Sequence, residues 1–346
     1  MPSPNNPQIL IFSDEKWRAF VANNSQVNIF HHPNWIEVLA KCYGYQPFVI
    51  TNSDSKGEIL AGIPVVEVTS RLTGLRWISL PFSDHCAPLY MEERDLQQLI
   101  EELVSLSRNP ENPRIELRGN YPTHDLIHTH TGYVLHTLKL ESGLQALFGN
   151  LHPMHRRNIK KAQKSGVRIE ISANQKQLDD FYQLHMKNRR RQGIPVQPKK
   201  FFNLLQNKLL NQGLGFILSA YLDDECIAAY IFLHWGETLT YKFGASNPER
   251  HNLRPNNLMM WEGIRWGCEN GYCILDLGRS SISNVGLRRF KNMWGAEETP
   301  LTYAFLPARS YSSPNERMER VMNIIIRNTP PWVSRASGEL FYRHFA

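Results

Sequence analysis

Residues 215–243 have the sequence GFILSAYLDDECIAAYIFLHWGETLTYKF and predict three consecutive strands. The first two, over residues 215–221 and 226–233, are long apolar runs on either side of an Asp223-Asp224 turn. The third covers residues 238–243. Apolar runs bounded by turn residues are typical of strands inside a sheet. The segment therefore predicts three adjoining strands of one sheet.

Helices and further strands surround this segment. Downstream, a helix over 257–270 carries Leu258, Trp261 and Ile264 at turn spacing, and strands follow over 273–277 and 301–305. Upstream, the patterns predict helices over 144–148, 155–164, 175–190 and 199–210 and a strand over 167–171.

The N-terminal half has a similar order of elements. It predicts strands over 9–12, 48–50, 59–66, 72–80, 114–118 and 133–140, and helices over 15–21, 33–43 and 96–106. No sequence repeat accompanies this order, so duplication is inferred from the elements alone. We expect an α/β fold (α+β, with mixed sheets) in two similar domains.

The length of 346 residues suits two hydrophobic cores better than one. The patterns predict an N-terminal domain over 1–145, a C-terminal domain over 146–310 and a helical extension over 311–346. Within this extension, residues 315–326 form an amphipathic helix. It either packs on the body of the protein or contacts a membrane surface through its flanking arginines.

The formal net charge of +7 favours an anionic partner, although a basic protein without a polyanionic partner remains an alternative. The five scattered cysteines indicate a reducing compartment and no disulfide framework. The N-terminus lacks the pattern of a signal peptide, and no apolar stretch reaches 18 residues. We therefore expect a cytoplasmic protein, either free or at the inner face of the membrane, with no DNA partner.

A strongly basic helix is predicted over 155–164, and no acid occurs between Leu151 and Ile169. Arg157, Lys161 and Lys164 lie on one helical face, and Arg156 and Lys160 lie on the next. Uncompensated cations on one helix repel each other. The helix is therefore a candidate site for phosphate or nucleic acid, with a solvated basic face as the alternative.

A second candidate site follows Tyr241, where a strand ends at Gly244 and a helix begins after Pro255. The start of a helix presents free N–H groups that bind phosphates or carbonyl oxygens. Tyr241, Asn256 and Asn257 are therefore candidate substrate contacts. Either asparagine could instead be a simple N-cap.

The most specific candidate begins with Asp276-Leu-Gly-Arg279 at a strand end and continues into the run from Gly286 to Gly295. Lys291, beside Phe290, could stabilise an oxyanion or bind a diphosphate. Asp276 either pairs with Arg279 or orients an amine.

Several motifs of other enzyme classes are absent, including GxSxG, the P-loop, GxGxxG and HExxH. No histidine spacing suggests a metal site, and we expect no tightly bound cofactor. Acylation of an amine by an activated ester needs none of these motifs. It needs two aligned substrates and a stabilised oxyanion.

The motifs together resemble the FemAB family, and more narrowly its exopolysaccharide- and exosortase-associated branch. They lie mostly in residues 150–300. The resemblance rests on RRNIKKA at 156–162, YKFGAS at 241–246, RPNNL at 254–258, DLGR at 276–279 and GLRRFKNMWG at 286–295.

The resemblance implies two tandem domains of the GCN5-related N-acetyltransferase (GNAT) type with a cleft between them. It implies transfer of an aminoacyl or acyl group to an amine, such as one on a peptidoglycan or other envelope polysaccharide precursor. Lys291 then assists the transition state, and Arg157, Arg279 or Arg289 holds phosphates. No segment between Gly166 and Gly215 is long enough for the helical arm of several tRNA-dependent members.

We therefore expect an acyltransferase in which Lys291 stabilises the oxyanion, Asp276 positions the amine and Arg156, Arg157 and Lys160 bind phosphate. The donor is aminoacyl-tRNA or acyl-CoA. One alternative is a CoA-dependent N-acyltransferase of a sugar amine, although residues 250–257 match the usual CoA loop poorly. The other is a non-catalytic basic scaffold for an anionic polymer or membrane, which predicts that the aromatic-lined cleft near Trp294 is filled or absent.

Overall fold

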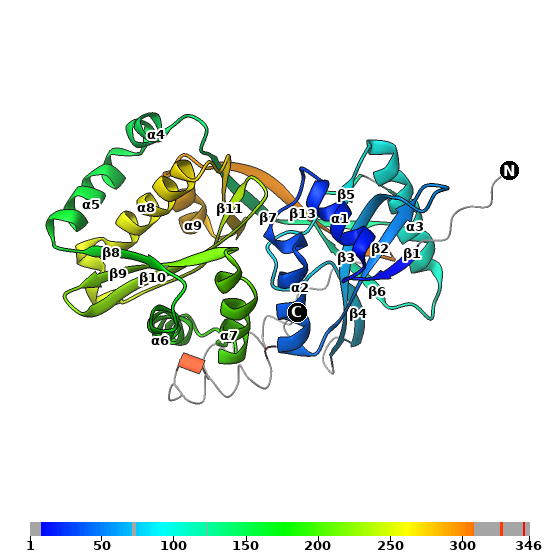
Figure 1. Ribbon diagram of the computed structural model, residues 1–346, viewed down its shortest axis with the longest axis horizontal. Helices are drawn as coiled ribbons and strands as arrows, with labels where there is room; N and C mark the ends of the chain where they lie inside the picture. The colour runs from blue at the N-terminus through cyan, green and yellow to red at the C-terminus, as the bar shows by residue number, and fades with distance from the viewer. Residues whose placement is uncertain (1–7, 71–73, 123, 308–325, 328–341, 343–346) are drawn as a thin grey trace. The chain divides into compact units, whose positions relative to one another are not determined.

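The computed structural model describes residues 8–70, 74–122, 124–307, 326–327 and 342 (Figure 1). These residues form two compact units. Unit 1 contains the described residues up to Tyr133 together with 300–307, and unit 2 contains 134–299 with 326, 327 and 342. Apart from Ile326, Arg327 and Tyr342, the expected C-terminal extension over 311–346 lies outside the described residues.

The division differs from the domain boundary expected at residues 145 and 146. Unit 1 ends its first segment at Tyr133, inside strand β7 (His128–Lys139), and the chain re-enters it at Pro300, inside β13 (Glu297–Leu306). Residues 303–306 of β13 pair with β6 (Arg114–Arg118) in antiparallel register. Pairing between segments so distant in sequence leaves no local sequence pattern.

Unit 1 contains a mixed sheet with strand order β1-β2-β3-β4-β6-β13. Its remaining strands are β1 (Gln8–Ile11), β2 (Gln46–Ser53), β3 (Ile59–Ser70), β4 (Gly74–Ile78) and the short β5 (Leu89–Tyr90), which pairs with β3. Along this order β4 and β6 form a parallel pair, and the other neighbouring strands pair in antiparallel register.

Three α-helices belong to unit 1: α1 (Glu15–Asn23), α2 (Pro33–Tyr43) and α3 (Glu93–Arg108). The predicted bounds of α2 are confirmed. Pro33 occupies its first turn, and Gly44 ends it with φ 77°, a left-handed conformation that glycine adopts easily. Leu99 and Leu103 of α3 are fully buried in the core against the sheet.

Unit 2 contains the strand order β7-β12-β11-β10-β9-β8, with β7 contributing its residues from Val134 onward. The strands are β8 (Arg168–Ser172), β9 (Gly215–Leu222), β10 (Glu225–Trp235), β11 (Thr238–Ser246) and β12 (Ile274–Ser281). The prediction that β9, β10 and β11 adjoin in one sheet is confirmed, and these strands pair in antiparallel register.

Helices cover both faces of this sheet (Figure 1). One face carries α4 (Leu144–Asn150), α5 (Pro153–Lys164), α8 (Pro255–Glu269) and α9 (Val285–Asn292); the other carries α6 (Gln175–Gln192) and α7 (Lys199–Lys208). The sequence patterns predicted all of these helices except α9.

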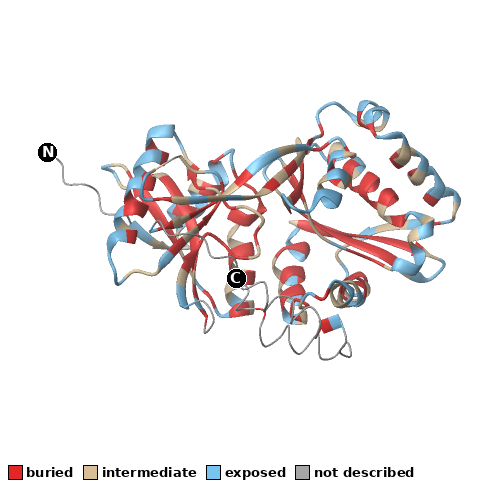
Figure 2. Ribbon diagram, turned by 180° about the vertical axis from the view of Figure 1, so that it is seen from behind, coloured by how far each residue is buried: buried red, intermediate tan, exposed pale blue. Residues whose placement is uncertain are grey.

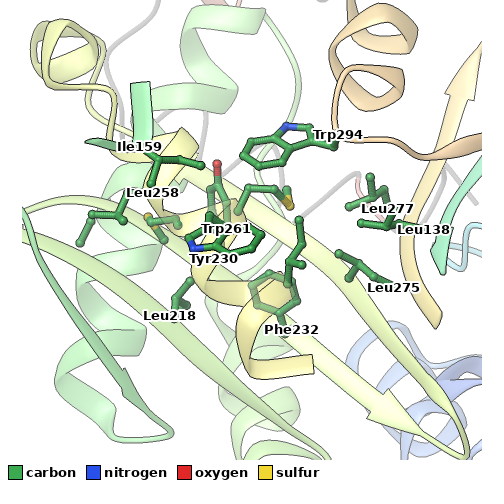
Figure 3. Packing of buried hydrophobic residues seen from close by; sticks show 14 of the residues in the cluster. Leu138, Ile159, Leu218, Tyr230, Phe232, Leu258, Trp261, Leu275, Leu277 and Trp294 are labelled. Carbon is green, nitrogen blue, oxygen red and sulfur yellow. The ribbon is translucent and has the colours of Figure 1, made fainter. Parts of the chain in front are cut away.

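The core of unit 2 lies between the sheet and the pair α5–α8 (Figure 3). Ile159 of α5 and Leu258 of α8 meet Phe232 and Leu218 there, and all four are at most 2% exposed. Figure 2 shows the same pattern in both units, with buried residues on the strands and on the helix sides that face them. The mixed α/β fold is therefore confirmed.

All five cysteines are free thiols. Among the residues that the structure describes, no helix combines the length and the apolar composition needed to cross a bilayer.

Candidate active site

The two parallel strands in the middle of unit 2 separate after a short pairing. β11 pairs with β12 at residues 238–240 and 274–276 only. Beyond these pairs β11 continues along β10 to Ser246, and β12 continues to Ser281. Since the ladder ends while both strands go on, main-chain groups on their facing edges are left for other partners.

A β-bulge accompanies the separation. Tyr241 pairs with Phe232 and Phe243 pairs with Ile231, so Lys242 is an extra residue in β11. A bulge bends its strand and increases the local twist. It therefore helps to turn β11 away from β12, directly after their last common pair.

Tyr241, a predicted substrate contact, lies at the start of the separated part of β11. Its ring meets the Tyr230 ring edge-on, with centroids 4.8 Å apart. A Cβ at position 244 would overlap the Tyr241 hydroxyl, so the phenol requires glycine there. Burial raises the pKa of Tyr241 well above its usual range, which keeps the phenol protonated at neutral pH.

The predicted catalytic residues Lys291 and Asp276 meet at Gly278 of β12. The Lys291 ammonium, on α9, donates hydrogen bonds to the carbonyl oxygens of Gly278 at 2.9 Å and Arg279 at 3.1 Å. Asp276 accepts a hydrogen bond of 2.7 Å from the Gly278 N–H, and Gly278 has φ 72°. Lys291 is 6% exposed and Asp276 2% exposed, so both side chains are buried beside the separated strand.

A charged cluster next to Lys291 was not predicted. Glu298 accepts hydrogen bonds from His136 Nε2 at 3.0 Å and from Arg288 Nε and Nη2 at 3.1 and 2.7 Å. The Arg288 guanidinium is the largest cause that lowers the pKa of Glu298, to about 2. Burial, and then the nearby Lys291 ammonium, lower the pKa of His136. The cluster thus combines an ionised carboxylate with a neutral imidazole at ordinary pH.

Ser246, the last residue of β11, forms a hydrogen bond with the first turn of α8. The Ser246 hydroxyl receives a hydrogen bond of 3.2 Å from Asn256 Nδ2 and lies 2.9 Å from His251 Nε2. Tyr230 donates its hydroxyl to the Asn256 carbonyl oxygen at 3.4 Å. The Asn256 side-chain oxygen is buried and has no hydrogen-bond partner. Arg254, in a left-handed conformation, occupies the N-cap position.

Asn257, another predicted contact, is buried and bonds to α5. Its amide nitrogen lies 2.6 Å from His155 Nδ1. The His155 ring stacks on Trp294, with centroids 4.2 Å apart, and burial lowers the pKa of His155 to about 4. Trp294 is 1% exposed and belongs to the core of unit 2.

The predicted basic helix is α5, and its cations point away from the core. His155, Ile159 and Ala162 form its buried side. The outer side carries Arg156, Arg157, Lys160, Lys161 and Lys164, and no ion pair of these five occurs among the described residues.

Two adjoining grooves run along this side of α5. One, of about 820 Å³, lies between the start of α5 and α9, and Arg156 and Arg289 contribute to its lining. The other, of about 650 Å³, is lined by Arg157, Lys160, Lys161 and Lys164 together with Arg156. Arg156 and Pro153 belong to both grooves, so the basic surface is continuous.

The structure therefore places the predicted residues in three groups. Lys291, Asp276 and the Arg279 carbonyl meet at Gly278; Arg156, Arg157, Lys160 and Arg289 line the grooves; Tyr241 and Asn256 lie near Tyr230. Asn257 stands apart in its bond to His155. His136 and Glu298 could have been noticed as polar residues within strand segments, but nothing local in the sequence links them.

Comparisons with known proteins identify similar domains and similar folds. Residues 153–292 match the family described as "Acetyltransferase (GNAT) domain". No curated protein matches the sequence of the chain.

Three solved structures have a similar fold at low sequence identity. FemX has a TM-score of 0.65 at 12% identity, with 91% of this chain and 100% of FemX covered. L-PGS from Bacillus licheniformis has a TM-score of 0.53 at 13% identity, with 92% and 97% covered. A tandem GNAT protein from the clavulanic acid biosynthesis pathway has a TM-score of 0.53 at 7% identity, with 88% and 100% covered.

The domain match supports an acyltransferase-type activity, and the structural matches concern the fold. Residues 153–292 are similar to GNAT acetyltransferase domains, and the chain as a whole has the tandem GNAT fold.

Proposed function

We propose that unit 2 transfers an aminoacyl or acyl group from an activated donor to an amine. The observation that carries this proposal is the separation of β11 from β12, with Tyr241 on one strand and the Lys291-bound Gly278 on the other. The main-chain N–H and C=O groups on the facing edges of separated strands can bind an extended substrate by hydrogen bonds. The match of residues 153–292 to acetyltransferase domains supports the same chemistry.

In the proposed reaction, the amine nitrogen forms a bond to the acyl carbon, and negative charge develops on the carbonyl oxygen. The tetrahedral intermediate then expels the thiolate or ribose oxygen of the donor, which takes up the proton that the amine loses. No covalent enzyme intermediate is needed. The main contribution of the protein is alignment of the substrates and a fixed positive field at the oxygen.

Lys291 supplies that field in our proposal. Its ammonium is buried behind the Gly278 and Arg279 carbonyls, where the low polarity of the surroundings strengthens its effect. Asp276 positions the amine through the Gly278 peptide, whose N–H it binds. Tyr241 contacts the substrate with a protonated phenol.

The donor phosphates bind to the basic surface in this proposal. Arg156 and Arg289 line the groove of about 820 Å³, and Arg157 and Lys160 extend it along α5. Asn256 lies at the positive end of α8, and Arg279 follows Gly278 on β12.

The donor is either aminoacyl-tRNA, as the FemAB resemblance implies, or acyl-CoA, which the acetyltransferase domain match favours. At the loop before α8, Arg250 bonds to Glu225 at 2.6 Å and is not directed to a phosphate. The proposed acceptor is an amine on a peptidoglycan or other envelope precursor, which places the reaction in the cytoplasm or at the inner membrane face.

The test combines donor binding with turnover. Binding of aminoacylated tRNA, uncharged tRNA and acetyl-CoA is measured over a salt series, followed by consumption of each bound donor with a panel of amines. Preference for the aminoacylated form supports the tRNA donor, and binding of acetyl-CoA alone supports the CoA donor. The acyltransferase proposal is contradicted if the protein binds aminoacylated and uncharged tRNA equally, if this binding weakens steeply as the salt concentration rises, and if no donor is consumed.

A further inference from the structure

The basic side of α5 continues into an exposed apolar cluster at the start of α9. We name the combined area the α5–α9 surface. It consists of Arg156, Arg157, Lys160, Lys161, Lys164 and Arg289, with the apolar residues Ile282, Val285 and Leu287.

The positive charge of this surface is uncompensated. None of its six cations has an ion pair among the described residues. Glu298 is the only acid that lines the grooves there, and Arg288 already bonds to it at 2.7 Å. The surface is therefore complementary to a partner with dense negative charge.

The apolar residues are unusually open to solvent for their size. Val285 is 68% exposed, Ile282 41% and Leu287 38%. The three residues lie within positions 282–287, directly after β12 and in the first turn of α9. Exposed aliphatic side chains grouped in this way mark an interaction site more often than isolated ones do.

Val285, the most exposed of the three apolar residues, shares a groove with cations of this surface. Val285 and Arg289 line one side of the 820 Å³ groove, and Arg156 lines the other. A partner that contacts Val285 therefore lies within reach of the charges on α5.

We propose that the α5–α9 surface docks unit 2 onto a bilayer that contains anionic lipids. Lipid headgroups supply the negative charge, and the acyl-chain boundary accepts the aliphatic tips of Val285 and Leu287. A polynucleotide offers no comparable partner for aliphatic tips. Of the nearby rings that could stack on bases, Trp294 and His155 are buried at 1% and 0% exposure, and Phe148 and Phe290 are half-buried against the core.

The test is sedimentation of the full chain with vesicles of phosphatidylcholine, with and without one third of phosphatidylglycerol. Lys161→Gln/Lys164→Gln is the charge variant, because these two lysines lie outside the proposed donor contacts. Each removed cation weakens binding to an anionic bilayer about fivefold, so we expect roughly a 25-fold loss for the pair. Val285→Ser/Leu287→Ser is expected to weaken binding about tenfold while keeping its salt dependence.

The matched control is Lys187→Gln/Lys200→Gln, which removes the same charge from α6 and α7, on the other face of the sheet. Binding to anionic vesicles that falls with the surface variants and not with the control supports the proposal. Equal losses with the control, or no effect of the serine variant, overturn it. Loss of tRNA binding without loss of vesicle binding also overturns it and assigns the lysines to nucleic acid.

This inference goes beyond acyl transfer and can fail separately from it. Arg156, Arg157, Lys160 and Arg289 are also the donor contacts of the proposed function, so the two proposals share these four residues. The two tests remain separate, because vesicle binding needs no donor and donor consumption in free solution needs no vesicle.

Discussion

The ammonium nitrogen of Lys291 lies 2.9 Å from the carbonyl oxygen of Gly278, at the point where β12 has separated from β11. Asp276 binds the N–H of the same glycine at 2.7 Å. One peptide segment is thus held from both sides by opposite charges. This arrangement makes Lys291 part of the fold as well as the leading catalytic candidate.

Replacement of Lys291 should affect both stability and turnover. Lys291→Ala leaves the Gly278 and Arg279 carbonyls without their donor, which we expect to cost about 1–3 kcal/mol of unfolding free energy. Lys291→Met fills the space without the charge and should lower acyl transfer about 100- to 1,000-fold. Denaturant unfolding and donor consumption measure the two effects. Full turnover of the folded Met variant would exclude Lys291 from the mechanism.

Glu298 should make the protein more sensitive to acid. The pKa of Glu298 is lowered to about 2, so its contribution to stability is complete above pH 4.5 and is lost as the pH falls toward 2. Because the side chain is partly exposed, we expect Glu298→Gln to cost about 1–2 kcal/mol at pH 7. Thermal unfolding from pH 7 to pH 2 tests this. The exposed neighbour Glu297→Gln is the control, and equal effects of the two changes would contradict the role of the His136–Glu298–Arg288 cluster.

Glu102 of unit 1 should change the pH dependence of the unfolding free energy in the opposite direction to Glu298. Burial raises the pKa of Glu102 to about 7, although Gln98 donates a hydrogen bond of 3.3 Å to it. A raised carboxyl pKa gives stability that is present below pH 4.5 and is lost as the pH rises through 7. Glu102→Gln should therefore raise the unfolding free energy by about 1–2 kcal/mol at pH 8 and change little at pH 4. Glu101→Gln, at an exposed neighbouring position, should show no such difference.

Gly244 should tolerate no side chain while Tyr241 keeps its position. Gly244→Ala places a methyl group on the Tyr241 phenol, and we expect a loss of about 1–3 kcal/mol as the ring moves. Tyr241→Phe removes the hydroxyl and should recover part of that loss in the double variant, which a double-mutant cycle measures. Gly149→Ala in α4 meets no atom within 4 Å and should be neutral or slightly stabilising. Additive effects at positions 241 and 244 would show that the phenol and the glycine are not coupled.

The strands and most helices were predictable because each leaves a local pattern. The apolar runs around Asp223 specify β9 and β10, and Pro33 with Gly44 marks both ends of α2. Helix α9 was missed because it has only eight residues and its buried residue is Lys291, so it lacks the buried apolar positions that mark the longer helices. A buried lysine on a short helix is indistinguishable in sequence from an exposed one.

The surroundings of the site depend on contacts across the chain. His136 and Glu298 are 162 residues apart in sequence yet 3.0 Å apart in space. No local pattern joins them, and the same holds for Asn257 and His155, which are 102 residues apart. The charged candidate residues could be identified from the sequence, but their contacts with one another depend on the fold.

The chain passes from unit 1 into unit 2 within β7 and returns within β13. During translation, β6 therefore emerges long before the strand that completes its edge, residues 303–306. A ribosome must synthesise all of residues 134–299 in the meantime, so every described strand of unit 2 except the shared β7 and β13 is made before residues 303–306 complete the sheet of unit 1. A fragment truncated at residue 145 would therefore expose an open β-edge prone to aggregation.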